Sequence, residues 1–188
     1  MASISRRVRN LFSFVILPAA VFLGSASLIE AATYEVINTN DSGAGTLRQT
    51  VLVAVSGGDT IVFAPSLNGQ TITLTSGEIT VKTNLTILGP GSGLLTVSGN
   101  NASRVFDFKG GVSTISGLTI AHGRVAGGNG ITGDGGGGGG GGMGAGLLAD
   151  TSSTVSIQDV TFASNTVIGG NGGGNEGAAS GDPGLPSP

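Results

Sequence analysis

The segment Ile115-Ser-Gly-Leu118-Thr-Ile120-Ala121 returns 42 residues later as Ile157-Gln-Asp-Val160-Thr-Phe162-Ala163. The large apolar residues keep their places in both copies, as do one threonine and one alanine. A pattern that recurs at a fixed distance indicates a repeat protein, in which each unit buries its apolar face against the next unit. Short β-branched runs between Gly, Asn and Ser indicate that these units consist of strands.

Similar short runs cover most of the chain after residue 32. Most of them are three to five residues long and are separated by turn-forming Gly, Asn, Ser and Pro. We expect strands at Tyr34–Asn38, Thr60–Phe63, Thr71–Leu74, Glu78–Val81, Leu85–Leu88, Leu94–Val97, Val105–Phe108, Thr114–Ser116, Leu118–Ala121, Thr154–Ile157 and Val160–Phe162.

Two interleaved ladders connect these strands. One joins residues 61–63, 85–87 and 105–107 at offsets of 24 and 20, and the other joins residues 71–73, 94–96 and 117–119 in steps of 23. A period in the twenties with several short strands per period predicts an all-β parallel solenoid. Its inward side chains line up in columns, and we expect this of Ile72, Ile87, Val97, Phe106, Ile115 and Ile120.

The glycine-rich segment 127–146 contains fourteen glycines in twenty residues. The 42-residue offset exceeds one coil of about 22 residues by about the length of this twenty-residue segment. We therefore expect the segment to be a loop that projects from one coil. Eight consecutive glycines at 135–142 cost too much backbone entropy to become ordered without a specific partner. We therefore expect a flexible, linker-like loop at 127–146 and a flexible Gly/Pro-rich tail at 169–188.

Residues 1–31 have the layout of a secretory signal peptide. Arg6, Arg7 and Arg9 precede the apolar stretch Leu11–Leu23, and small residues follow up to position 32. The stretch is shorter than the ~20 residues that a membrane-spanning helix needs. We expect cleavage at a position within 26–32, which leaves a β-helix domain over 32–168; an uncleaved amphipathic anchor is the alternative.

A short helix is predicted near the start of this domain. Thr46-Leu-Arg-Gln49 is a capping box, and Leu47, Val51, Ala54 and Val55 form one apolar face that ends near Gly57-Gly58. The first coil of a solenoid has an unpaired edge, and covering it prevents edge-to-edge aggregation. We expect a capping helix; an ordinary connecting helix is the alternative.

Composition excludes several classes of function. The 188 residues include no cysteine, so disulfides and cysteine-based metal, redox or nucleophilic sites are impossible. Eight Lys and Arg stand against eleven Asp and Glu, which provides no basic surface for nucleic acid. No phosphate-binding Gly-x-x-x-x-Gly-Lys motif occurs, and we expect neither a nucleotide nor another cofactor.

Candidate catalytic groups are few. Glycoside hydrolysis generally requires two carboxylates that flank the scissile bond. The acidic residues within the coils are Glu78, Asp107, Asp150 and Asp159. Strand alternation turns Asp107 outward if Phe106 and Phe108 point inward, and Arg104 and Lys109 beside it predict a surface ion pair. No pair of these acids shares a predicted register, so we expect no catalytic residues.

Other ligand-binding patterns are incomplete. His122 has no carboxylate or serine partner nearby in the sequence and is interpreted as a surface-turn residue. Gly127-Gly-Asn-Gly130-Ile-Thr132 has threonine where a calcium-binding nonapeptide has aspartate. The segment 38–49 faintly echoes an EF-hand loop, but Gln49 replaces the bidentate glutamate. We expect no metal site.

Four stretches resemble bacterial exported right-handed β-helix proteins of the polymorphic outer-membrane protein and autotransporter-adhesin type. The resemblance covers roughly residues 33–175. The matching stretches are Asn38–Gln49 after the signal peptide, the coil-turning segment Leu94–Val105, the looser match Met143-Gly-Ala-Gly-Leu147, and Phe162-Ala-Ser-Asn165, which matches the short repeat of Phe, two variable residues and Asn.

The resemblance implies a pectin-lyase-like right-handed parallel β-helix that is secreted or displayed on the bacterial outer-membrane surface. It implies a non-enzymatic, adhesin-like or passenger-like scaffold with a host-surface or polysaccharide ligand, and membrane association only through the signal peptide or a C-terminal part. We expect the chain to be the N-terminal fragment of a larger surface protein. A fragment of a carbohydrate-active lyase or hydrolase and a non-functional truncated product are the alternatives; ligand, anchoring mode and oligomeric state stay open.

Overall fold

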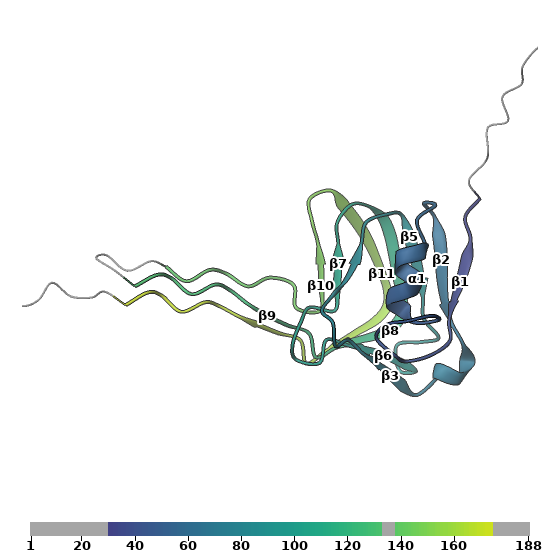
Figure 1. Cartoon of the computed structure of the whole chain (residues 1–188), viewed down its shortest axis with the longest axis horizontal. Coiled ribbons are helices and arrows are strands. Elements are labelled where there is room, and N and C mark those ends of the chain that lie inside the picture. The colour runs from purple at the N-terminus through teal and green to yellow at the C-terminus, as the bar shows by residue number, and fades with distance from the viewer. Residues whose placement is uncertain (1–29, 133–137, 175–188) are drawn as a thin grey trace, which may run out of the picture.

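The computed structural model describes residues 30–132 and 138–174, so most of the expected signal peptide lies outside the described residues. This part of the chain consists mainly of strands, and the largest sheet curls around the core (Figure 1). The elements in chain order are β1 Thr33–Val36, α1 Leu47–Val53, β2 Asp59–Phe63, a 3₁₀ turn at Pro65–Leu67, β3 Gln70–Thr73, β4 Ile79–Val81, β5 Leu85–Leu88, β6 Leu95–Ser98, β7 Phe106–Phe108, β8 Gly111–Ala121, β9 Arg124–Ala126, β10 Leu147–Ala149, β11 Ser153–Ala163 and β12 Thr166–Ile168.

Every strand pair is parallel, and the strands form three sheets. The largest sheet joins β1, β2, β5 and β8 on one side and β3, β6 and β8 on the other, because the long strand β8 pairs with both β5 and β6. β11 adds to the other edge of β8. The second sheet has the order β10-β7-β4, and the third joins β12 to β9. The chain thus returns to the same three sheets in successive layers.

The core consists of aliphatic and aromatic columns that run from layer to layer. Ile61, Ile87 and Ile115 lie side by side in one column, as do Ile72, Val97 and Ile120 in a second. All six inward residues predicted from the sequence are buried, which confirms the prediction. Each buried side chain of this size contributes about 1.5–3 kcal/mol relative to an exposed one. The stack is therefore held by burial between layers as well as by ladder hydrogen bonds.

The two predicted ladders are correct only in part. Thr96 pairs with Thr119 as expected, but Ile61 pairs with Ile87 rather than with Leu85, and Ile72 pairs with Val97 rather than with Leu95. The segment 105–107 belongs to a different sheet, where Phe106 pairs with Ile79. Short apolar runs on the different sides of a layer have the same sequence pattern, so periodicity alone cannot assign them to a sheet.

The predicted helix is present and covers the first layer. Thr46 caps α1 by accepting the N–H of Gln49 at 3.2 Å, and α1 contacts β1 and β4. Leu47, Val51 and Ala54 are buried as expected. The prediction for Val55 is wrong: the helix ends at Val53, well before Gly57, and Val55 is 65% exposed because the chain leaves the helix before that position can turn inward.

Candidate interaction surface

The last described layer leaves one edge of the stack unpaired. Within the described residues, β11 pairs only with β8, β12 only with β9, and β10 only with β7. On the outer edge of each of these three strands, the backbone N–H and C=O groups therefore form no hydrogen bonds with a further described strand. We refer to the edges of β10, β11 and β12 together as the open end.

Inward positions change from buried to exposed at the open end. Ile157 pairs with Ile115 and Phe162 pairs with Ile120, so each pair occupies one column. The inner residue of each pair is fully buried, whereas Ile157 is 45% exposed and Phe162 is 47% exposed. The apolar columns thus continue to the surface at the open end.

The Phe-x-x-Asn motif joins the last two layers at a corner. The Asn165 side chain donates from Nδ2 to the Ile120 carbonyl and accepts the Gly123 N–H at Oδ1, both at 2.8 Å. Gly123 approaches this corner so closely that an added Cβ would lie 2.1 Å from the Ala145 carbonyl oxygen. Asparagine therefore satisfies backbone groups of the preceding layer, which gives the motif a structural role.

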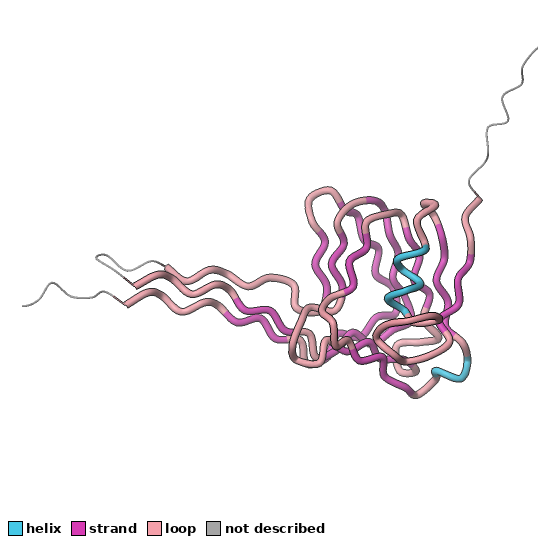
Figure 2. The backbone as a smooth tube through the Cα atoms, viewed as in Figure 1, coloured by secondary structure: helices cyan, strands magenta, loops and turns pink. Residues whose placement is uncertain are grey.

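The glycine-rich segments leave the body as three extended chains that run side by side (Figure 2). These chains, residues 127–132, 138–143 and 169–174, are referred to as the glycine stalk. Backbone hydrogen bonds connect each pair: Gly130 N–H donates to Asn171 O at 2.7 Å, Gly140 N–H donates to Gly128 O at 2.7 Å, and Gly170 N–H donates to Gly140 O at 2.8 Å. Because all three pairs are bonded, the stalk is a three-chain bundle.

Glycine is required where these chains approach one another. An added Cβ on Gly127 would lie 1.9 Å from the Gly140 oxygen, one on Gly139 would lie 2.0 Å from the Gly170 oxygen, and one on Gly170 would lie 1.9 Å from the Gly128 oxygen. Collagen uses glycine in the same way, because only glycine fits between closely packed extended chains.

The structure describes residues 127–132 and 138–146 of the expected loop and joins these two stretches by a backbone hydrogen bond, and the flexibility of the loop stays a prediction. Residues 138–142 of the long glycine run find their partner in the second glycine tract, which begins at residue 169. The flexibility of the tail at 169–188 likewise stays a prediction, although residues 169–174 are hydrogen-bonded in the stalk; residues 133–137 and 175–188 lie outside the described residues. Gly/Ser content favours a linker, but it does not show that two tracts from successive layers will meet.

A network of charged side chains covers the outer face of the second sheet, β10-β7-β4. Arg104 Nη1 lies 2.6 Å from Glu78 Oε2 and 3.8 Å from Asp107 Oδ2, and Lys109 Nζ lies 2.9 Å from the same Asp107 oxygen. Phe106 and Phe108 are buried on the core side, so Asp107 faces outward and forms the predicted ion pair. The Asp107 hydrogen bond raises the pKa of the Lys109 ammonium.

Burial of Asp107 was not anticipated. Its side chain is only 2% exposed, and among the described residues its Oδ1 atom has no hydrogen-bond partner. Strand alternation identifies the face on which a residue lies, but it cannot show that Arg104 and Lys109 will cover that residue. The structure also brings Glu78 and Asp107 together through Arg104, although their sequence positions showed no shared register.

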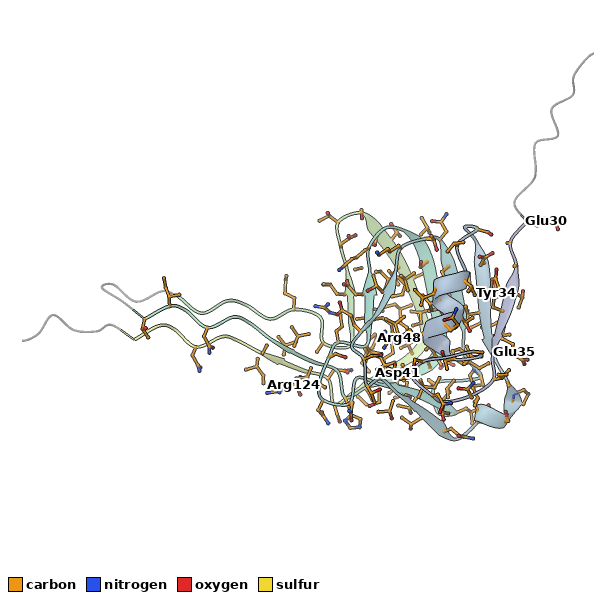
Figure 3. All side chains as sticks on the ribbon, viewed as in Figure 1. Glu30, Tyr34, Glu35, Asp41, Arg48 and Arg124 are labelled. Atoms are coloured by element: carbon orange, nitrogen blue, oxygen red, sulfur yellow. The ribbon has the colours of Figure 1, made fainter. Side chains whose placement is uncertain are left out.

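A second ion pair joins Asp41, in the segment before α1, to Arg48 in the first turn of α1. Asp41 Oδ1 lies 2.8 Å from Arg48 Nη2, and Arg48 also donates to the Gly77 and Glu78 carbonyls; Figure 3 shows the two side chains beside α1. Burial alone would raise the pKa of Asp41, but hydrogen bonds from Ser76 and Arg48 lower it to about 2.

The remaining candidate residues lie apart from this network. Asp159 accepts hydrogen bonds from Ser92 and borders a surface groove of about 240 Å³ that Pro90 and Gln158 also line. Asp150 accepts bonds from Ser152 and Ser153, and the Ser152 bond lowers its pKa. His122 is exposed and has a φ of 51°, in agreement with its interpretation as a surface-turn residue.

The described surface contains ion pairs, hydrogen bonds and exposed apolar side chains. In residues 30–132 and 138–174, no group of three His, Cys, Asp or Glu side chains is placed to hold a metal ion. No helix in these ranges is long and apolar enough to cross a membrane. No family model, curated protein or solved structure matches the chain.

Proposed function

We propose that this protein is a right-handed parallel β-helix that serves as a secreted or cell-surface scaffold, adhesin-like or passenger-like and without enzymatic activity. The repeat of layers is the observation that supports the proposal. The step from β8 to β11 keeps ten register pairs over 42 residues, even though a glycine-rich excursion interrupts the layer. A body that tolerates such an excursion without losing register is suited to carrying projecting segments.

The glycine stalk is the part of this scaffold that would meet a partner. It extends away from the body, and its three described chains contain no charged residue (Figure 1). Exposed Asn129, Ile131 and Met143 provide amide and apolar groups along its length. A polysaccharide or a host-cell surface is the partner class that we propose, since such neutral groups recognise hydroxyl-rich or apolar surfaces without charge.

The adhesin proposal is tested with beads that carry residues 32–188. We expect them to bind at least one member of a panel of polysaccharides and cell surfaces. A variant that replaces residues 127–146 with an Asn-Gly turn serves as the control and should lose that binding while keeping its strand circular dichroism. Absence of binding across the panel, or equal binding by the control, would refute the proposal.

Two features support the further proposal that this is the N-terminal part of a larger surface protein: the signal-like residues 1–31 and the open end. Genomic sequence downstream of Pro188, read in all frames, is expected to contain more layers and further Phe-x-x-Asn motifs. An unrelated gene at that place would contradict this part of the proposal and leave a short exported scaffold.

The contact of Glu78 and Asp107 with Arg104 favours a second candidate, a fragment of a carbohydrate-active enzyme. Paired carboxylates are the groups that glycoside hydrolysis requires. Here cations neutralise both of them, which favours a structural role. Incubation with polysaccharides should release no new reducing ends or unsaturated products; release that disappears in Asp107→Asn would establish the enzyme instead.

A further inference from the structure

The strands of the last layer and its glycine tract behave as one repeating unit. β11 on β8 and β12 on β9 share an offset of 42 residues, since Ile157 pairs with Ile115 and Val167 with Val125. The same offset continues into the stalk, where the Asn171 N–H donates to Asn129 Oδ1 at 2.9 Å. Register is therefore maintained from the core of the stack out into the projecting chains.

The open end has an unpaired strand edge that nothing in its own sequence protects from pairing with a further strand. β11 presents an edge of eleven residues, and its only charged residue, Asp159, is engaged by Ser92. Natural sheets guard such edges with lysine, proline or a covering element. Residues 153–163 contain neither lysine nor proline, and half-exposed Ile157 and Phe162 continue the buried columns.

Several stalk glycines have no explanation within the described chain. An added Cβ on Gly128, Gly141 or Gly169 would meet nothing within 4 Å, and none of the three has a positive φ. Neither packing nor backbone conformation therefore requires glycine at these positions. In extended chains, glycine without such a reason marks a place where another backbone approaches closely.

Together these observations identify the missing neighbour. We propose that the open end docks one further layer of the same repeat, with large apolar residues at the places of Ile157, Val160 and Phe162, and that the glycine tract of this layer joins the stalk. The proposal rests on the scaffold function proposed above. The sequence of residues 175–188 does not contain this apolar pattern, because Leu185 is its only large aliphatic residue.

The test inserts a second copy of residues 133–174 after Gly174 of the full chain, which continues the 42-residue register. We expect amide hydrogen exchange in β11 to slow by at least about tenfold, as for amides moved from an edge into a sheet interior. The thermal midpoint should rise by several degrees, and binding of a hydrophobic dye should fall. Unchanged exchange in β11 would overturn the proposal.

A matched insert tests the role of the tract. It carries alanine at the inserted copies of Gly139 and Gly170, and it should protect β11 while the amides of the inserted glycine tract exchange fast. Equal protection of the inserted tract in both inserts would refute the shared bundle. As a check that needs no redesigned chain, a peptide of residues 153–174 added to the unmodified protein should slow the same β11 amides, and a scrambled peptide should not.

Sedimentation of the unmodified protein separates a further layer from a second copy. We expect a monomer. A dimer that Ile157→Lys dissociates would make a second copy the occupant and overturn the proposal. These readouts do not involve adhesion, so failure of the bead assay leaves the docking result intact, and failure of docking leaves the bead result intact.

Discussion

The two ends of the stack differ in what covers them. At the first layer, α1 lies against β1 and β4, and Leu47 and Val51 join the core. At the open end, residues in the same columns as buried isoleucines are about half exposed. An inward position is thus buried only if a neighbouring layer or helix covers it, as in repeat proteins whose stability is a sum over neighbouring units.

The largest difference in stability between the two ends is expected when a charge is placed in the column of Ile72, Val97 and Ile120. Ile120→Asp puts a carboxylate at a fully buried position, and an unpaired buried charge costs several kcal/mol, a large part of the roughly 5–15 kcal/mol that stabilises a typical domain. We expect the body to unfold, as judged by circular dichroism and thermal denaturation.

The matched variant is Phe162→Asp. Phe162 pairs with Ile120 in the same column but lies at the open end. It should keep the fold and lose less than about 1–2 kcal/mol, because water still solvates the new charge. Equal losses from the two substitutions would show that the ends are not different, and wild-type stability of Ile120→Asp would refute the assignment of the inward face.

The covered end is probed by removing the helix contact. Leu47→Ala deletes a fully buried side chain from α1 and should lower the free energy of unfolding by about 2–5 kcal/mol. Leu52 lies on the outer side of the same helix and is 63% exposed, so Leu52→Ala should change the free energy of unfolding by less than about 0.5 kcal/mol. Denaturant titrations measure both, and a similar cost for both would mean that α1 does not cover the stack.

A third comparison concerns the stalk. Gly170→Ala introduces a Cβ where a backbone oxygen lies 1.9 Å away, so the chains must separate. We expect loss of exchange protection at Gly130 and Gly140 and a cost of about 1–3 kcal/mol, as for other overpacked sites. Gly169→Ala faces open space and should leave both amides protected. If both variants protect these amides equally, the three-chain bundle is wrong.

The smallest effect is expected from pH at the covered end. The pKa of Asp41 is about 2 in the folded protein and 3.8 as its ordinary value, so the ionised carboxylate stabilises the fold. This stability is present above pH 3.8 and is lost as the pH falls toward 2. Surface screening limits it to roughly 1–2 kcal/mol. Asp41→Asn should make the free energy of unfolding less dependent on pH over that range. An unchanged pH dependence would show that Asp41 is not the source of this stability.

Sequence reasoning succeeded where local pattern and neighbouring layers agree. Ile115 and Ile157 recur with their flanking residues, so their pairing follows from the repeat itself. The capping box at Thr46 likewise depends on nearby residues. These features need no knowledge of which distant strands meet.

The errors arose where distant segments decide the outcome. Leu85 and Ile87 are both buried and equally apolar, so the sequence could not show which of them pairs with Ile61. The hydrogen bonds of the stalk join two glycine tracts from different layers, and composition alone does not predict that these tracts meet. Strand alternation likewise turned Asp107 outward without revealing its burial.

The parallel register of the last two layers is the central claim, and a crosslink tests it most directly. The chain contains no cysteine, so Thr114→Cys with Ser156→Cys, at paired outward positions, creates a single disulfide candidate. Neighbouring parallel strands place paired residues within disulfide range. We predict rapid oxidation of this pair and none for Thr114→Cys with Val155→Cys, whose second residue lies on the opposite face. Equal oxidation of both pairs, or oxidation of the second alone, would contradict the stack.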